Sequence, residues 1–464
     1  MTPSGSDSDS DHYYYYNYYD LAIIGAGILG SSIAYFLSQV TNSKIILIEQ
    51  ERGVAFHTSS RNTGKVHAPF LYDPIKKRFF AKAASLGYEM WKQYCRLKSL
   101  PFIQDGIMEV ATSENGVERL SKYMVWGEAN GLRNGKDFWL LDKNQVKEIE
   151  PNVNCVSAIL CEKDASVNFG VITQNLAEDS RKSGCKVLLG NRLKSVFRGT
   201  NDGTIGLTLT DGDQEHTIKT RFLVNAAGGN AVDIAHSLGV GNKYTDFHFR
   251  GEYWQAPPEY HELTKRSIYS VPKFPDYPFL DPHWIVRIDG RREVGPNAVP
   301  VFGPYAYNWT VNAKNFFPKV AESLRSLGVT RLLFDKKFLT LLGYEVQSSL
   351  SKTVMINRVK KFLPKLQVSS FEKKGTSGVR SSLISPDGKF VSDTMVLRDD
   401  SSISILNYNS PGATGALPMA ASVVFELIDS GIVMRNETKE KDFENKTNWD
   451  IEILSNEMKL SELG

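Results

Sequence analysis

The chain has 464 residues, too many for one ordinary hydrophobic core, so two or three intertwined lobes are expected. Its 55 Lys and Arg residues against 52 Asp and Glu residues give a net charge of +3, which gives no sign of a nucleic-acid partner. The four cysteines are scattered and form no Cys-x-x-Cys pair. This favours reduced core residues of a cytoplasmic protein over a metal site or a disulfide framework.

No apolar run approaches the roughly 18–20 residues of a membrane helix, so no spanning segment is expected. The N-terminus lacks the basic-then-apolar order of a signal peptide. Residues 1–18, rich first in Ser and Asp and then in Tyr, are expected to form a disordered tail. Residues 436–464 are expected to form a charged, peripheral C-terminal tail.

The first ordered element is an apolar run at residues 21–24, typical of a parallel strand that is buried on both faces. A glycine turn follows, and a helix opens at Ile28. Gly25 permits the tight turn, Gly27 lets a pyrophosphate approach the backbone, and Gly30 lets the helix pack against the strand. The phosphates would lie at the positive end of the helix.

A second apolar strand at residues 45–48 ends in Glu49, 19 residues after Gly30. An acidic residue at this spacing is placed to accept hydrogen bonds from a ribose diol. A glycine turn alone is a weak signal, but the two strands and the acidic residue together indicate a dinucleotide site.

The next segments are expected to alternate between loops, helices and strands. The polar loop at residues 55–67, with its small hydroxyl residues, suits phosphate and flavin oxygens, and a helix at 74–95 buries an apolar stripe. The expected elements that follow are a strand pair within 102–111, helices at 117–131 and up to 183, a parallel strand at 186–189, a hairpin of 205–209 with 216–219, and a buried strand at 221–225.

From residue 250 to 304 the chain becomes aromatic and proline-rich, which predicts a second, antiparallel lobe. Helices are expected at 314–327, 352–362 and 417–430.

Several motifs occur in the order found in a known family. They are Asn62-Thr63-Gly64-x-x-His67, Phe249-Arg250-Gly251-Glu252-Tyr253, Pro278-Phe279-Leu280-x-x-His283-x-x-x-Arg287, Gly378-Val379-Arg380 and Ser410-Pro411-x-Ala413-Thr414. With the glycine turn, this set resembles the FAD-dependent oxidoreductases of the D-amino-acid-oxidase superfamily. Over residues 19–430 it is most similar to the L-2-hydroxyglutarate dehydrogenase/oxidase family. Arg61 stands where that family usually has His, and Lys65 where it usually has an aliphatic residue.

The resemblance implies an α/β fold. A Rossmann-like FAD-binding domain would be interleaved with an antiparallel α+β substrate domain. The expected division is 19–100, 155–245 and 366–435 for FAD, and 101–154 and 246–365 for substrate. The residues expected to hold FAD are Gly25, Gly27, Ile28, Gly30, Glu49, Gln50, Thr58, Ser59, Ser60, Asn62, Thr63, Gly64, Leu193, Ala227, Gly228, Gly378, Gly412, Ala413 and Thr414.

The implied reaction is FAD-dependent oxidation of a 2-hydroxy acid, foremost L-2-hydroxyglutarate to 2-oxoglutarate, by hydride transfer to flavin N5. His283 is the expected general base, because a neutral histidine accepts a proton at pH 7, and His67 is the rival. An arginine fork grips a carboxylate with two hydrogen bonds. The residues expected to act on the substrate carboxylates are Arg287 and Arg380, with Arg250, Tyr72 and Arg61 in support.

Three alternatives stay open. One is an amine oxidase of the same superfamily that acts on glycine, sarcosine or a D-amino acid. Another is an sn-glycerol-3-phosphate dehydrogenase, and the most distant is a flavin-binding protein without catalysis. Oxygen, a quinone or a soluble carrier could accept the electrons, and the expected location is the cytoplasm, with peripheral membrane contact open.

Overall fold

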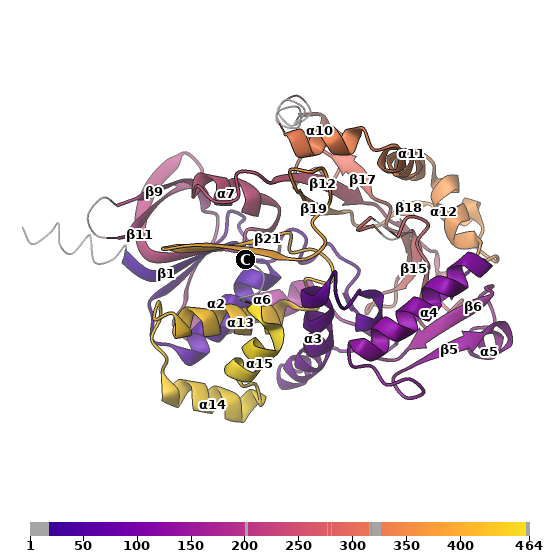
Figure 1. Ribbon diagram of the computed structural model, residues 1–464, viewed down its shortest axis with the longest axis horizontal. Coiled ribbons are helices and arrows are strands. Elements are labelled where there is room, and N and C mark those ends of the chain that lie inside the picture. Colours follow the sequence, from indigo (N-terminus) through magenta and orange to yellow (C-terminus); the bar gives the residue numbers. More distant parts are fainter. Residues whose placement is uncertain are drawn as a thin grey trace, which may run out of the picture.

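The computed structural model describes residues 18–460 except 200–202, 276, 280, 315–316 and 318–325. Residues 1–17 of the expected tail and most of the helix expected at 314–327 lie outside the described residues. Figure 1 shows the sheet that contains β1, β11 and β21 toward one end of the molecule and the sheet that contains β5, β6 and β15 toward the other.

The first sheet is parallel at its centre, in the order β20-β21-β11-β1-β2-β8. Its strands are β1 (Tyr18–Ile24), β2 (Ile45–Ile48), β8 (Lys186–Leu188), β11 (Gln214–Asn225), β20 (Met395–Asp399) and β21 (Ser402–Leu406), extended by β9 (Arg192–Arg198) and β10 (Ile205–Asp211). All four residues of β2 are buried because helices and strands cover both faces. The second strand of the expected hairpin (216–219) and the expected buried strand (221–225) form one long strand, β11. Its first part pairs with β10, and its last part lies between β1 and β21.

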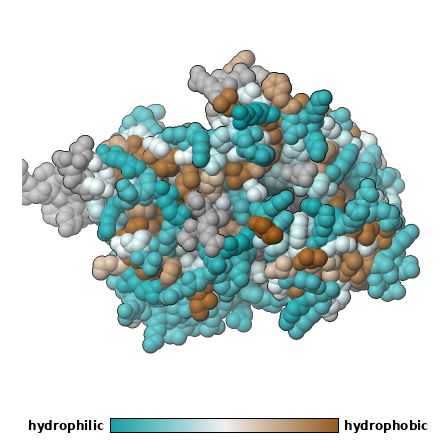
Figure 2. Space-filling view, in the orientation of Figure 1, coloured by the Kyte–Doolittle hydropathy of each residue, from teal (hydrophilic) through white to brown (hydrophobic). Residues whose placement is uncertain are grey.

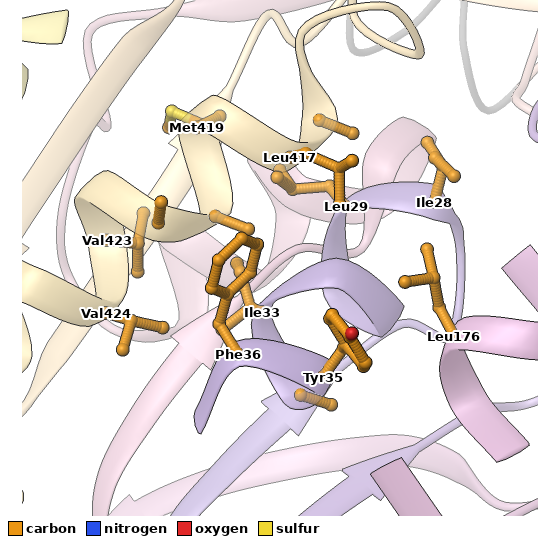
Figure 3. Packing of buried hydrophobic residues seen from close by; sticks show 14 of the residues in the cluster. Ile28, Leu29, Ile33, Tyr35, Phe36, Leu176, Leu417, Met419, Val423 and Val424 are labelled. Carbon is orange, nitrogen blue, oxygen red and sulfur yellow. The ribbon is translucent and has the colours of Figure 1, made fainter. Parts of the chain in front are cut away.

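Helices cover one face of this sheet and form the main core. They are α2 (Ile28–Val40), α3 (Arg78–Leu97), α6 (Phe169–Lys182) and α13 (Ala416–Asp429). Figure 3 shows Ile33 and Phe36 of α2 facing Leu417 and Val423 of α13. Burial of each such side chain stabilises the fold by about 1.5–3 kcal/mol.

The chain after residue 435 differs from the expected peripheral tail. It forms α14 (Glu437–Thr447) and α15 (Ile451–Met458), which lie against α2 and α13 (Figure 1). Trp449 stacks on Phe36 with ring centroids 5.7 Å apart, and Phe443 lies edge-on to the same ring. The high charge of this segment hides a few apolar residues that share one buried face, so composition alone misleads.

The second sheet is mixed, in the order β18-β13-β16-β15-β14-β4-β6-β5. Its strands are β4 (Ile107–Ala111), β5 (Phe138–Asp142), β6 (Ser157–Cys161), β13 (Trp254–Gln255), β14 (Ser267–Ser270), β15 (His283–Val286), β16 (Arg292–Gly295) and β18 (Lys373–Lys374). Met355 and Ile356 of α12 (Lys352–Lys360) pack on one face. Leu120 and Tyr123 of α4 (Glu114–Ala129) pack on part of the other face.

This sheet moves two expected domain boundaries. β6 was assigned to the FAD domain, yet it is fully buried and pairs with β4 and β5. β18, also assigned there, pairs with β13. The strand expected before Gly106 is absent from the described residues, where Ile103 forms only an isolated bridge to Ser166.

Two smaller ladders complete the site region. One sheet contains β17 (Val299–Val301), β12 (Thr245–Gly251) and β19 (Gly378–Ile384), and β3 (Lys65–Val66) pairs with β7 (Ala165–Ser166). The remaining helices are α5 (Lys143–Ile149), α7 (Ala231–Ser237), α8 (Trp309–Lys314), α10 (Leu327–Leu333) and α11 (Lys336–Leu350), with short turns η1 (Pro69–Leu71), η2 (Gly228–Asn230), η3 (Pro258–Tyr260) and η4 (Val368–Ser370). The helix α11 was not anticipated from the sequence.

The face in Figure 2 carries hydrophilic side chains over most of its area, with hydrophobic residues in small groups. Among the described residues, no helix is both long and apolar enough to cross a membrane. The four cysteines are free and buried, as expected.

Candidate active site

One cavity of about 420 Å³ runs from the glycine turn after β1 to the inner face of the second sheet. This volume lies in the range of roughly 300–1,000 Å³ that is usual for ligand sites. Residues from distant parts of the chain line this cavity. Gly25 and Glu49 lie at the end beside the glycine turn, and His67, His283 and Arg380 lie at the end beside the second sheet.

The glycine turn is sterically obligatory. Gly25 has a φ of +102°, and a Cβ there would lie 2.7 Å from the Ala226 carbonyl oxygen. A Cβ on Gly30 would lie 1.9 Å from the Gly25 carbonyl oxygen, so this residue permits the close packing of α2 on the turn. Both positions therefore match the roles predicted for a dinucleotide turn.

The side chain of Glu49 is fixed at this turn. The Ala26 N–H donates to Oε2 at 2.8 Å, and the Glu51 N–H donates to Oε1 at 3.0 Å. The Ser59 hydroxyl accepts the Ile28 N–H at 2.8 Å, at the start of α2. The predicted ribose acceptor and the predicted phosphate loop thus converge on one helix N-terminus, which suits a dinucleotide.

Most residues expected to hold FAD line the cavity. They are Gly25, Gly27, Ile28, Glu49, Gln50, Thr58, Ser59, Asn62, Thr63, Leu193, Ala227, Gly228, Gly378, Gly412, Ala413 and Thr414. Three do not. Gly30 packs under the turn, Gly64 lies against the Val167 carbonyl, and the Ser60 hydroxyl donates to the His57 carbonyl. The glycine cradle, the acidic acceptor and the cavity volume of about 420 Å³ fit FAD.

His283 lies on β15 and lines the other end of the cavity. Its Nδ1 contacts the Asp281 carbonyl oxygen at 2.9 Å. Because a carbonyl only accepts, Nδ1 carries the proton, and Nε2 presents a lone pair. Nε2 is buried and has no hydrogen-bond partner among the described residues. Burial lowers the pKa of His283 to about 4, so the ring is neutral at pH 7.

His67 follows β3 and lines the same end of the cavity. Its backbone N–H donates to the Thr414 hydroxyl at 3.0 Å, and its Nδ1 has no hydrogen-bond partner in the part of the chain that the structure describes. Burial, together with the neighbouring His283 and the positive charges of Lys65 and Arg380, lowers the pKa of His67 to about 3. The structure therefore brings both candidate bases to one end of the cavity in the neutral form.

Tyr269 lies between the two histidines and was not predicted. Its ring centroid is 3.7 Å from that of His283 and 6.3 Å from that of His67. Its hydroxyl is buried without a partner among the residues described, and burial raises its pKa well above the usual value. In the sequence, Tyr269 is one aromatic residue in the short strand Ser267–Ser270, where nothing distinguishes it from a core residue.

Arg380, one of the two arginines predicted to bind carboxylates, lines the cavity. It lies on β19, and its Nη1 donates to the Pro278 carbonyl at 2.6 Å. Desolvation by burial lowers its pKa from the usual value. An arginine nevertheless keeps its charge in a protein, so Arg380 offers a cation beside both histidines.

Arg287, the other predicted arginine, is not brought to the cavity. Its Nε donates to Glu293 Oε2 at 2.7 Å, and its Nη1 donates to the Asn62 carbonyl. His283 and Arg287 were expected to share one face of a strand, but β15 ends at Val286, one residue before Arg287. The buried carboxylate of Glu293 on β16 neutralises the guanidinium.

Arg250 is also occupied internally. It is fully buried, its Nη2 donates to Glu252 at 2.8 Å, and its Nη1 donates to the Ala306 carbonyl at 3.2 Å. The guanidinium also stacks on Trp309 at 4.7 Å. Arg250 is thus a structural ion-pair partner and does not line the cavity.

The two supporting residues differ. Tyr72 is buried and does not line the cavity. Arg61 lines it, stacks on Tyr307 at 4.2 Å and donates to the Phe56 and Ser377 carbonyls. Among the described residues, no cluster of three or more His, Cys, Asp or Glu could hold a metal ion.

Comparisons with known proteins extend over most of the chain. The sequence profile of the family described as FAD dependent oxidoreductase matches residues 20–425. An L-2-hydroxyglutarate dehydrogenase of Escherichia coli is 31% identical over 408 residues, covering 88% of this chain and 92% of the relative. The mitochondrial L-2-hydroxyglutarate dehydrogenase of Dictyostelium discoideum is 30% identical over 422 residues, covering 88% and 92%.

Solved structures show the same fold. The L-alpha-glycerophosphate oxidase of Mycoplasma pneumoniae, with FAD bound, aligns with a TM-score of 0.69 at 20% identity, covering 93% of this chain and 95% of the oxidase. The glycine oxidase of Bacillus cereus aligns with a TM-score of 0.64 at 17% identity, covering 90% and 99%. The predicted fold class and superfamily are confirmed.

Proposed function

The chain belongs to the FAD dependent oxidoreductase family, and on this premise we propose that it oxidises a 2-hydroxy acid, foremost L-2-hydroxyglutarate to 2-oxoglutarate. The observation that carries the proposal is the Nε2 of His283, which has no hydrogen-bond partner among the described residues and shares one end of the cavity with the Arg380 guanidinium. When bound, FAD supplies the acceptor for the hydride from C2.

His283 takes the hydroxyl proton in this proposal. Its Nδ1–H is held by the Asp281 carbonyl, so the ring is fixed in the tautomer that leaves Nε2 basic. Its lowered pKa keeps Nε2 unprotonated at neutral pH. A bound carboxylate beside the ring offsets this lowering, because a nearby negative charge favours the imidazolium that forms during reaction.

Arg380 binds the C1 carboxylate in this proposal, since a guanidinium can donate two parallel hydrogen bonds to it. Its bond to the Pro278 carbonyl uses Nη1 and orients the group. A five-carbon diacid needs a second cation, and Arg61 is the remaining predicted arginine that lines the cavity. Arg287 and Arg250 keep their structural ion pairs.

The test is anaerobic mixing of purified holoenzyme with one compound at a time while the visible flavin band is followed. The compounds are L-2-hydroxyglutarate, D-2-hydroxyglutarate, L-lactate, sn-glycerol 3-phosphate and sarcosine. We expect bleaching by L-2-hydroxyglutarate alone. Bleaching by sarcosine or the phosphate ester instead would overturn the substrate assignment and leave the family unchanged.

The base is tested by His283→Ala, for which we expect the bleaching rate to fall by about 10²–10⁴-fold, the usual contribution of a positioned base. His216→Ala is the matched control, because His216 is exposed on β11 and does not line the cavity. An equal loss in His67→Ala with a normal rate in His283→Ala would move the role to His67. Repeating turnover with oxygen, a quinone or a soluble dye then identifies the electron acceptor.

A further inference from the structure

Lys65 is the residue whose cation was unexpected in the family pattern, and its ammonium group pairs with the carboxylate of Asp105. It lies on β3, which pairs with β7 in the register Lys65 to Ser166 and Val66 to Ala165. Continued by one residue, this antiparallel register sets His67 opposite Asp164. The ladder therefore places a buried carboxylate directly behind one of the active-site histidines.

Three buried charges meet there, and we call Lys65, Asp105 and Asp164 the Lys65 cluster. Lys65 Nζ donates to Asp105 Oδ2 at 2.6 Å and lies 3.8 Å from Asp164 Oδ1. The side chains of Lys65 and Asp164 have no exposed area, and that of Asp105 is 8% exposed. Two carboxylates thus compete for one ammonium group away from water.

Asp164 joins this cluster to the active site. Its Oδ2 accepts the Ala68 N–H at 3.2 Å and lies 3.8 Å from His67 Nδ1. Within the described residues, neither His67 Nδ1 nor Asp164 Oδ1 has a hydrogen-bond partner. Catalytic hydrogen bonds are often long before substrate binds, so a small ring movement lets Nδ1–H reach Oδ2.

The surroundings decide the charge of Asp164. Burial raises its pKa to about 7, with Lys65 opposing this rise and Asp105 adding to it. The other titratable groups that face Asp164 or its partners are His67, Tyr72, Tyr88, Cys161, Tyr269 and Arg292. Burial raises the pKa of the tyrosines and the thiol, so these groups stay neutral across the working range.

We propose that Asp164 is a positioning residue for His67, and that Lys65 and Asp105 set the pH at which it acts. Ionised Asp164 accepts the His67 Nδ1–H, which fixes the ring and presents Nε2 to the cavity. Protonated Asp164 cannot accept this bond in the same way, and the ring loses its orientation. The inference rests on the proposed function, because it assigns the pH dependence of that reaction.

The titration of the two histidines in the free protein is expected below neutrality. The pKa of His67 is lowered to about 3 and that of His283 to about 4. An acid limb in kcat/KM near pH 7 therefore belongs to Asp164, and activity rises with pH as this carboxyl ionises. The pH of this acid limb should shift when a neighbouring charge is removed, and the sign of the removed charge sets the direction of the shift.

The experiment compares pH profiles of kcat/KM for three variants of the holoenzyme. Lys65→Met removes the cation, so we expect the acid limb to move up by about one pH unit or more. Asp105→Asn removes the like charge and leaves Lys65 to Asp164, so we expect the limb to move down by about one unit. Asp164→Asn should abolish the limb and lower kcat at every pH, and Lys194→Met, an exposed lysine, is the control.

Opposite shifts are a result that a purely structural role does not produce. If Lys65→Met fails to fold, Asp105→Asn alone still tests the direction in which the acid limb shifts, because this variant leaves one ammonium group paired with one carboxylate. Coincident acid limbs in Asp105→Asn and the unaltered protein would overturn the proposal.

A second measurement needs no substrate, so it separates this inference from the proposed function. Infrared difference spectra of the oxidised holoenzyme between pH 5 and pH 9 should include a titrating carboxylic acid band that is missing in Asp164→Asn. The band should titrate at higher pH in Lys65→Met and at lower pH in Asp105→Asn. Absence of any titrating band assigned to Asp164 would overturn the inference even if L-2-hydroxyglutarate is the substrate.

Discussion

The two ends of the cavity differ in how their polar groups are hydrogen-bonded. At the glycine turn, backbone groups and a fixed carboxylate meet, and the oxygens of Glu49 both accept N–H groups. At the other end, Nε2 of His283, Nδ1 of His67 and the hydroxyl of Tyr269 are buried without partners among the described residues. Buried polar groups are normally satisfied, so the second end stores unused hydrogen-bonding capacity that a reacting molecule can take up. This difference agrees with the proposal that the first end binds the cofactor and the second end carries the reaction.

The largest effect is expected when one methyl group is added beside the glycine turn. Gly30→Ala would place Cβ 1.9 Å from the Gly25 carbonyl oxygen, against backbone that cannot yield. We expect a loss of more than about 4 kcal/mol in the free energy of unfolding, with little flavin retained. The measurement is the ratio of flavin absorbance to protein absorbance together with the melting temperature.

The matched control for this substitution is Gly343→Ala, a second glycine within a helix. Gly343 lies in α11, and a Cβ built there meets no described atom within 4 Å. Because alanine is the better helix former by about 1 kcal/mol, this variant should keep its flavin and lose no stability. Equal flavin content and equal melting temperatures in the two variants would contradict the steric role of Gly30.

The C-terminal helices α14 and α15 should contribute to the stability of the dinucleotide lobe. Trp449 is 4% exposed and stacks on Phe36 of α2. Trp449→Ala removes this large buried side chain, so we expect a loss of about 3–4 kcal/mol in the free energy of unfolding. Denaturant titration checks it, and Ile453→Ala, at a position that is 58% exposed, is the control. An unchanged midpoint would show that this C-terminal segment does not support the lobe.

A substitution of Arg380, at the other end of the cavity, should weaken substrate binding and leave the fold intact. Arg380→Lys keeps the charge and loses the planar fork, so we expect KM for the hydroxy acid to rise by about 10–100-fold. This equals about 1.4–2.8 kcal/mol of binding energy. Steady-state kinetics measure it, and Arg291→Lys, an exposed arginine paired with Asp289, is the control. A fall in kcat with unchanged KM would contradict the carboxylate role.

The free energy of unfolding should also depend on pH through one buried carboxyl group. Glu109 on β4 is buried, neither of its oxygens has a partner among the described residues, and burial raises its pKa to about 8. The folded state therefore holds a proton that the unfolded chain releases at about pH 4, so stability falls as pH rises between these values. The slope is about 1.4 kcal/mol per pH unit for one proton. Glu109→Gln should make the slope of stability against pH less negative by about this amount in denaturant titrations at pH 5.5, 6.5 and 7.5, whereas an unchanged slope would show that Glu109 is already ionised.

The glycine turn, Glu49 and both histidines could be located from the sequence because their signals are local or lie in ordered motifs. Arg287 was misjudged because the neutralising Glu293 comes from the next strand, and one strand alone does not reveal its partner's charge. The same limit hid the contact of Lys65 with Asp105, forty positions away. Tyr269 was missed because a tyrosine in a short buried strand such as Ser267–Ser270 has the pattern of any core strand.

The order of strands in the first sheet has a consequence for synthesis on the ribosome. β1 pairs with β2 soon after it in the chain, but its other neighbour is β11, and β11 in turn pairs with β21. The strand that leads into the glycine turn therefore emerges first, whereas its sheet is completed only when Ser402–Leu406 has been made. Such distant pairings form slowly. β1 therefore lacks its second neighbour until Asn225 has left the tunnel, and Gly412, Ala413 and Thr414, which line the cavity, are made later still.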